Sequence, residues 1–244
     1  MSSTHTYAID RTTMDAAPAP DGIDVEPHTG LTVGWPMHPD PDASYALYDF
    51  ATRTTAPMTL VGNGSVAGRD VLNYTASVAG PLADPNILQA LPPAMQKAQL
   101  ASLTPLLPAG LQAKLGAAAG SLPDSVPFNY TAVSNLALST DKTLGTPADG
   151  SLDLQVIANV EIGGENLSVM PVLAIDTRLT EQSVADAAST ASTVGRLLTL
   201  MGVVIPLAGA VLGLLLILVG VSRLRRRAPM ESTPHRDPQS LGTH

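Results

Sequence analysis

The sequence has no cysteine, few aromatic residues and few positive charges. Without cysteine the chain can form no disulfide, no zinc–thiolate site and no cysteine nucleophile. One Trp, five Tyr and two Phe among 244 residues leave few rings on which nucleobases could stack. The formal net charge of −8 would also repel a polyanion. These shortages exclude a disulfide scaffold and argue against nucleic-acid binding.

The rest of the composition is that of a folded chain. Hydrophobic residues make up 45% of the sequence and charged residues 14%, which is too apolar for a disordered polymer. A length of 244 residues accommodates one ordinary domain with accessory segments. Because aromatic residues are scarce, we expect Leu, Val, Ile, Met and Ala to fill the core.

One long apolar run stands near the C-terminus. Residues 197–221 contain 25 residues without a charge, and about 20 are enough to cross a bilayer as a helix. We therefore predict a transmembrane helix over 197–221. Gly209 and Gly213 have the G-x-x-x-G spacing that favours self-association of such helices. Pro206 lacks an amide hydrogen and should kink the helix in its first half.

Four arginines follow the apolar run directly, and short basic segments next to a membrane helix stay on the cytoplasmic side. These candidate topology residues are Arg223, Arg225, Arg226 and Arg227. Residues 222–244 carry a net charge of +3, whereas residues 1–196 carry −11. The charges predict a single-pass plasma-membrane protein with a basic cytoplasmic tail over 222–244 and the bulk of the chain outside the cytoplasm.

The N-terminus does not supply the export signal that this topology requires. Residues 1–10 have neither a basic n-region nor an apolar h-region. Either an upstream signal anchor is missing from this sequence, or the protein is tail-anchored with its domain inside the cell. The second arrangement would send four arginines across the membrane, so we favour a truncated or mis-started N-terminus.

Residues 1–179 are expected to form an α+β domain built on an antiparallel sheet. Alternating or β-rich stretches predict strands at 45–50, 58–61, 70–78, 126–138, 152–162 and 167–175. Gly62-Asn63-Gly64 and Gly163-Gly164 occupy the positions of hairpin turns between them. The first 45 residues are rich in Pro, Asp and Gly, which indicates turns between short strands.

A helical insertion is expected at about 81–123, where leucines recur at helical spacing and prolines divide the segment into short helices. The residues that would need burial there are Leu91, Met95, Leu103, Leu107 and Leu111. The alternative is a loose, Pro-rich linker. A juxtamembrane helix should begin near Thr180, with Glu181 in its first turn, and cover 180–196.

The sequence offers no catalytic, cofactor-binding or metal-binding constellation. His38, Asp40, Asp42 and Asp49 include oxygen ligands at alternating positions that would suit Ca²⁺, but the intervening prolines favour a solvated turn. Gly62-x-Gly64-x-x-Ala67 resembles part of a dinucleotide fingerprint but has β-type sequence on both sides. A hydrolase would need a Ser-centred site, and none is apparent. We therefore expect a protein that is not an enzyme and has no cofactor.

Five stretches resemble the PorA-like family of actinobacterial envelope proteins, a domain of unknown function. They are TYAIDRTTMDA at 6–16, LYDFATRTTAPM at 47–58, VAGRDVLNYTASVAGP at 66–81, LPPAMQKAQL at 91–100 and RLLTLMGVVIPL at 196–207. The resemblance implies an extracytoplasmic domain between two membrane helices, of which this sequence lacks the first and part of the domain's start.

The expected function is that of a membrane-anchored cell-envelope protein that binds a membrane lipid or another envelope protein, or that self-associates through its helix. The alternative, suggested by the family's porin label, is a channel component. A transmembrane barrel, however, needs many amphipathic strands of about ten residues and no long apolar helix.

Overall fold

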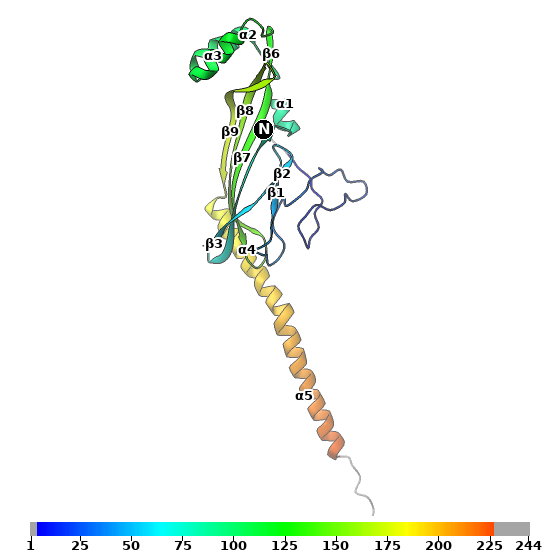
Figure 1. Ribbon diagram of the computed structural model, residues 1–244. Coiled ribbons are helices and arrows are strands. Elements are labelled where there is room, and N and C mark those ends of the chain that lie inside the picture. The colour runs from blue at the N-terminus through cyan, green and yellow to red at the C-terminus, as the bar shows by residue number, and fades with distance from the viewer. Residues whose placement is uncertain (1–3, 227–244) are drawn as a thin grey trace, which may run out of the picture. The chain divides into compact units, whose positions relative to one another are not determined.

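The computed structural model describes residues 4–226 of the chain (Figure 1). The chain divides into two compact units, Met1–Thr193 and Val194–His244. The first holds the α+β domain, and the second holds most of the apolar helix. The predicted fold class is confirmed.

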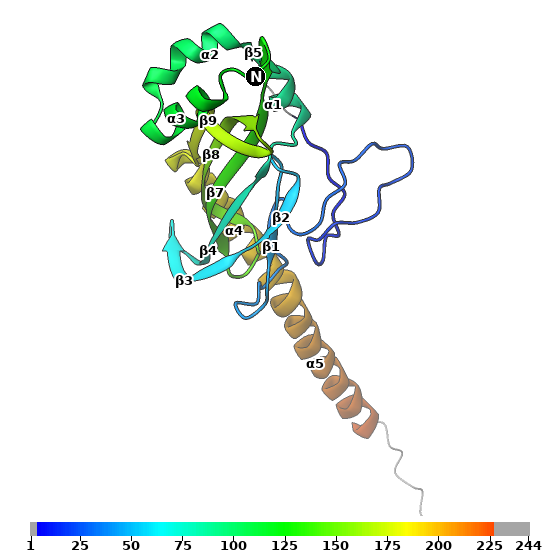
Figure 2. The same cartoon turned by 45° about the horizontal axis from the view of Figure 1, so that its top comes forward.

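A five-stranded antiparallel sheet is the framework of the first unit (Figures 1 and 2). Its strand order is β3-β4-β7-β8-β9, so that only the β4–β7 connection carries a long insertion. The strands are β3 (Thr59–Val66), β4 (Arg69–Pro81), β7 (Asn129–Asp141), β8 (Pro147–Ile162) and β9 (Glu165–Arg178). Each neighbouring pair is antiparallel.

The two faces of the sheet differ in polarity because side chains alternate along each strand. In β8, Leu154, Val156 and Ala158 are fully buried, whereas Asp153 and Gln155, which alternate with them, are exposed. One face therefore carries the core, and the other carries short polar side chains. This is the pattern expected of an antiparallel sheet with one solvated face.

The core face is covered by segments that precede β3 and follow β4 in sequence. They include the hairpin β1 (Ala46–Asp49) and β2 (Thr54–Pro57), and the short helix α1 (Pro85–Ala90). Ala51, Leu82 and Ile87 from these segments join the same hydrophobic cluster as the buried side chains of β8. A smaller cluster forms around Trp35 and Tyr74, whose rings stack 5.3 Å apart.

The prediction of short strands in the first 45 residues is wrong. Between Thr4 and Tyr45 the structure has only isolated bridges, such as Ile9 with Ala16. The Pro, Asp and Gly residues form turns instead: the Asp10 carboxylate accepts hydrogen bonds from the amides of Thr12 and Thr13. This segment lies on the side of the sheet where β1 and β2 lie (Figures 1 and 2).

One of the two predicted hairpin turns is also wrong. Gly62-Asn63-Gly64 lies inside β3, where Gly62 (φ +150°) follows a bulge between Leu60 and Gly62. The turn between β3 and β4 is Ala67-Gly68, with φ values of +45° and +78°. Positive φ at both central residues is the backbone of a type I′ turn, which alanine rarely adopts. Gly163-Gly164 does connect β8 and β9.

The segment between β4 and β7 contains short helices separated by prolines. After α1 come α2 (Lys97–Leu103), the 3₁₀ turn η1 (Thr104–Leu106) and α3 (Ala109–Ala118). A two-stranded ribbon of β5 (Ala94–Gln96) and β6 (Ser125–Pro127) closes its base. Leu100 of α2 and Leu115 of α3 are buried in the main core cluster. We call residues 97–118 the helical insertion; it lies at one end of the sheet (Figure 2).

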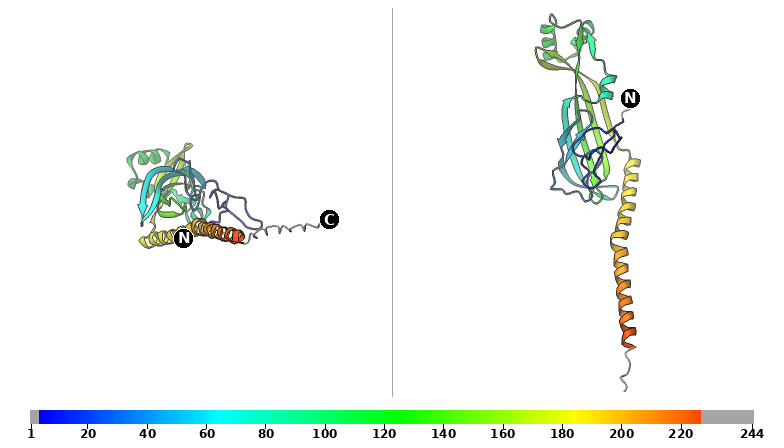
Figure 3. Two further views of the ribbon diagram at one scale, coloured as in Figure 1. Left: turned by 90° about the horizontal axis from the view of Figure 1, so that it is seen from below. Right: turned by 90° about the vertical axis from the view of Figure 1, so that its right-hand side faces the viewer.

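The C-terminal helix is the ribbon that continues from α4 (Glu181–Thr199) through η2 (Leu200–Val204) to α5 (Ile205–Arg226), as Figure 3 shows. The Thr180 hydroxyl accepts a hydrogen bond from the Ser183 amide and caps the start of α4. The turn η2 is π-helical and ends two residues before Pro206, which lacks the amide hydrogen that would continue the regular pattern. In the described part of the chain it is the one helix that is long and apolar enough to span a membrane, and a window of 18 residues in it has a mean hydropathy of 2.7.

Candidate functional site

An apolar groove of about 520 Å³ lies between the helical insertion and the strands β8 and β9. The insertion forms one wall and the sheet forms the other. Its lining residues are Leu103, Leu106, Leu107, Pro108, Leu111, Gln155, Ile157, Ser168, Val169, Met170 and Pro171. We call it the apolar groove.

The wall formed by the insertion consists of Pro108 and four leucines that are not fully buried, of which Leu107 also packs against the main core cluster. Leu103, Leu107 and Leu111 are half-buried, and Leu106 keeps 81% of its surface exposed. In contrast, Leu100 and Leu115 point into the core and are almost fully buried. The insertion is thus anchored by two leucines and presents four others to the groove.

The opposite wall exists because β8 and β9 are bulged. The pairing register shifts between Val156 and Ile157 and again between Ala158 and Asn159. Bulges bend a strand and redirect side chains, and they are common next to binding sites. Ile157 pairs with Pro171 at this point, and both line the groove.

The lining of the groove contains no charged residue, and only Gln155 and Ser168 are polar. Its volume falls within the range of about 300–1,000 Å³ that is typical of ligand pockets. The transfer of hydrocarbon from water to such a surface lowers the free energy. The groove therefore suits an apolar chain better than a charged or strongly hydrated group.

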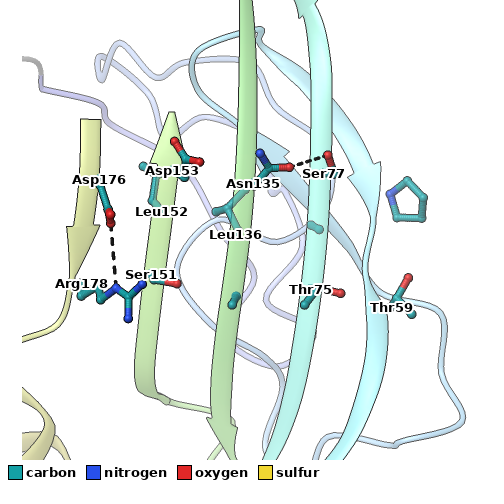
Figure 4. Close-up of a pocket in the computed structure, with 13 residues that line it drawn as sticks. Thr59, Thr75, Ser77, Asn135, Leu136, Ser151, Leu152, Asp153, Asp176 and Arg178 are labelled. Carbon is teal, nitrogen blue, oxygen red and sulfur yellow. Dashed lines mark hydrogen bonds and ion pairs between the residues drawn. The ribbon is translucent and has the colours of Figure 1, made fainter. Parts of the chain in front are cut away.

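A polar groove of about 670 Å³ runs across the solvated face of the sheet (Figure 4). It includes polar residues from all five strands: Thr59, Thr75, Ser77, Asn135, Ser151, Asp153, Asp176 and Arg178. Ser77 donates a hydrogen bond of 2.8 Å to Asn135, and Arg178 lies 3.9 Å from Asp176. On β8 the polar groove ends at Asp153, and the apolar groove begins at Gln155 on the same face.

A cluster of ionisable side chains centres on Glu26 in the N-terminal segment. His5 Nδ1 lies 2.8 Å from Glu26 Oε2, the Tyr48 hydroxyl donates to Glu26 Oε1 at 2.8 Å, and Arg53 lies 3.5 Å from the carboxylate. Burial alone would raise the pKa of Glu26, but the hydrogen bonds from His5 and Tyr48 hold it below its usual value. Burial and the Glu26 charge raise the pKa of Tyr7 to about 12.

This cluster also connects the N-terminal segment to α1. His5 Nε2 lies 3.3 Å from Oδ2 of the fully buried Asp84, a contact that lacks hydrogen-bond geometry. The other Asp84 oxygen accepts a hydrogen bond from the Ile87 amide and caps α1. Tyr7, His28 and Tyr48 pack ring against ring beside it. We interpret this cluster as a structural attachment of the N-terminal segment, because its hydrogen bonds and ring contacts join that segment to β1.

The possible calcium ligands do not meet. The Asp40 carboxylate accepts a hydrogen bond from the Asp42 amide in an exposed turn. Asp49 is buried, and its carboxylate accepts hydrogen bonds from the amide and the hydroxyl of Thr52. Within residues 4–226 no group of three or more His, Asp or Glu side chains has a metal-binding arrangement.

The four topology arginines lie at or beyond the end of the helix. Arg223 is an exposed residue of α5, and Arg225 and Arg226 are its last two arginines. Arg227 lies outside the described residues.

Sequence reasoning found one wall of the apolar groove and missed the other. The leucines of the insertion were visible through their helical spacing. Ile157 and Met170 look like ordinary strand residues, and nothing local distinguishes them from the core. The signal that was present is Pro171, because a proline inside a strand indicates a bulge or an edge.

A comparison with family models shows to which protein family the chain belongs. The model described as porin PorA matches residues 1–222. The chain belongs to the porin PorA family. No curated protein matches it. The porin description of the family and the long apolar helix agree on a membrane location for this PorA family member.

Proposed function

We propose that this PorA family protein is a single-pass protein of the actinobacterial cell envelope whose domain binds the hydrocarbon chain of a membrane lipid. It acts by binding and not by catalysis. The observation that carries the proposal is the apolar groove, with four leucines on one wall and Ile157 and Met170 on the other.

Two further features support a lipid chain as the occupant. The absence of charge in the lining fits a hydrocarbon chain, because burying an unpaired ionic group there would be costly. The chain's own apolar helix tethers the domain to a bilayer, so lipid is present at high local concentration. Arg223 to Arg227 support a cytoplasmic C-terminus and therefore an extracytoplasmic groove.

The proposal is tested by binding of a fluorescent long-chain fatty acid to the full-length protein in nanodiscs. Leu106→Asp places a charge on the groove wall at a side chain that is 81% exposed, so the fold should tolerate it. We expect about tenfold weaker binding, equivalent to about 1.4 kcal/mol. Met170→Gln, on the opposite wall, should weaken binding in the same direction.

The matched control is Leu88→Asp on α1, an exposed leucine that does not line the groove. Its affinity should remain that of the wild type. Equal affinities for all four proteins, or no binding by any of them, would overturn the proposal. Mass spectrometry of lipids extracted from the purified protein should find bound lipid that Leu106→Asp reduces.

A second candidate function is that of a channel component, which the porin description of the family favours. Here the membrane helix would self-associate along the face that carries Gly209 and Gly213. Purified protein would then produce discrete conductance steps in a planar lipid bilayer. Gly209→Leu together with Gly213→Leu should abolish these steps. A bilayer that stays silent with wild-type protein would exclude this candidate.

A further inference from the structure

We propose that the helical insertion is a lid over the apolar groove and that a Lys114–Glu165 ion pair latches its rim. The inference rests on the function proposed for the groove and concerns its regulation. It follows from the uneven way in which the insertion is attached to the sheet.

The base of the insertion is firmly attached. The ribbon of β5 and β6 pairs three residues on each side. The Lys97 amide donates to the carbonyl of Asp124, and the Lys97 ammonium donates to the carbonyl of Leu122. Beside the ribbon, the Tyr130 hydroxyl donates to the carbonyl of Pro92. These bonds make the ribbon a stable hinge.

In the described contacts one exposed ion pair joins the rim of α3 to β9, next to Leu115, whose side chain is buried in the core. Lys114 Nζ of α3 lies 2.9 and 3.1 Å from the two carboxylate oxygens of Glu165, the first residue of β9. The two side chains remain 52% and 65% exposed. Salt screens such pairs, and their contribution to stability is small. The latch is therefore easy to open, whereas the hinge is not.

The interior of the insertion also leaves room for movement. A cavity of about 210 Å³ lies between α2 and α3, and its lining includes the small residues Ala101, Gly116 and Ala119. Loosely filled space between helices allows them to shift at little cost, unlike a close-packed core. Opening the latch would move Leu106, Leu107 and Leu111 away from Ile157 and Met170 and widen the groove for a lipid chain.

The test measures the position of the lid directly, without added fatty acid. The chain has no cysteine, so Ala113→Cys on α3 and Glu161→Cys on β8 can carry two spin labels in the full-length protein in nanodiscs. Electron–electron resonance then gives the distance distribution between them. A control pair within the sheet, Thr59→Cys on the edge strand β3 with Asp176→Cys on the edge strand β9, should not respond to any condition.

We expect the distance between the labels at positions 113 and 161 to lengthen, and its distribution to broaden, as the ionic strength rises from about 0.01 M to about 1 M. This rise shortens the Debye length from about 30 Å to about 3 Å. Lys114→Met should show the open distribution at low salt. Exchanging the charges, Lys114→Glu with Glu165→Lys, should restore the closed distribution and its salt response. Identical distributions in wild type and Lys114→Met at both salt concentrations would overturn the lid.

Lipid uptake separates this inference from the function on which it rests. Lys114→Met should take up the fluorescent fatty acid about twofold to fivefold faster than the wild type, the range that an exposed ion pair allows. Lid motion without uptake by any variant would support the lid and overturn lipid binding. Uptake with an immobile lid would overturn the lid alone.

Discussion

At the scale of single residues, Gly145 occupies the most constrained backbone position near the turn between β7 and β8. Its φ is +69°, and its carbonyl accepts a hydrogen bond from the Trp35 amide at 2.8 Å. A Cβ at this position would stand 2.2 Å from the carbonyl oxygen of Pro36 and 2.3 Å from that of Trp35. These are backbone atoms, which cannot rotate away as a side chain would.

We therefore expect Gly145→Ala to lower the free energy of unfolding by about 3 kcal/mol or more, because backbone strain and steric overlap add. Urea denaturation followed by the fluorescence of Trp35 measures this directly. Gly163→Ala is the matched control: its φ is +61°, but nothing lies within 4 Å of the added carbon. It should cost only about 1–2 kcal/mol. Equal losses for the two variants would contradict the steric argument.

Asp141 beside the same turn should govern part of the acid sensitivity of the fold. Burial would raise its pKa, but the hydrogen bonds from Arg69 and from the amides of Leu144 and Thr143 hold it below the usual value. Its ionised form therefore stabilises the fold at neutral pH, and this contribution is lost as the pH falls below about 3.9. The stability difference between wild type and Asp141→Asn should shrink between pH 7 and about pH 3. A difference that stays constant with pH would contradict this.

At the scale of secondary-structure elements, α3 contains a glycine that lowers the stability of the helix. Gly116 lies inside the helix with nothing within 4 Å of an added Cβ, next to the cavity between α2 and α3. Gly116→Ala should raise the free energy of unfolding by about 0.5–1 kcal/mol, because alanine has less backbone freedom to lose. Thermal unfolding by circular dichroism measures the gain. Gly22→Ala, which has the same free space but a φ of +75°, should be destabilising instead.

Elements whose signal is local could be predicted from the sequence. The alternation of apolar and polar residues predicts β4 and β8, and the spacing of leucines between prolines predicts the short helices of the insertion. The turn at Ala67-Gly68 was missed because it places an alanine at positive φ. The ribbon of β5 and β6 was missed because three residues on each side carry too little pattern.

At the scale of the whole molecule, the apolar groove could not be predicted because it depends on long-range pairing. Its two walls lie about 50 residues apart in sequence, as the Lys114–Glu165 contact across the rim shows. Local patterns indicate that Leu103 and Leu111 need apolar surroundings, but not that bulged strands provide them. The same limit applies to Glu26, whose partners His5 and Tyr48 are 21 and 22 residues away.

The membrane orientation is a property of the whole chain, and a cysteine-free sequence permits a clean test of it. We expect Ser240→Cys in the tail to resist an impermeant thiol reagent in intact cells and to react after permeabilisation, because the arginines before it keep the tail inside. The control is Ser65→Cys, an exposed residue of β3, which should react in intact cells. The reverse pattern would contradict an extracytoplasmic groove. Lipid could then reach the groove only from the cytoplasmic leaflet.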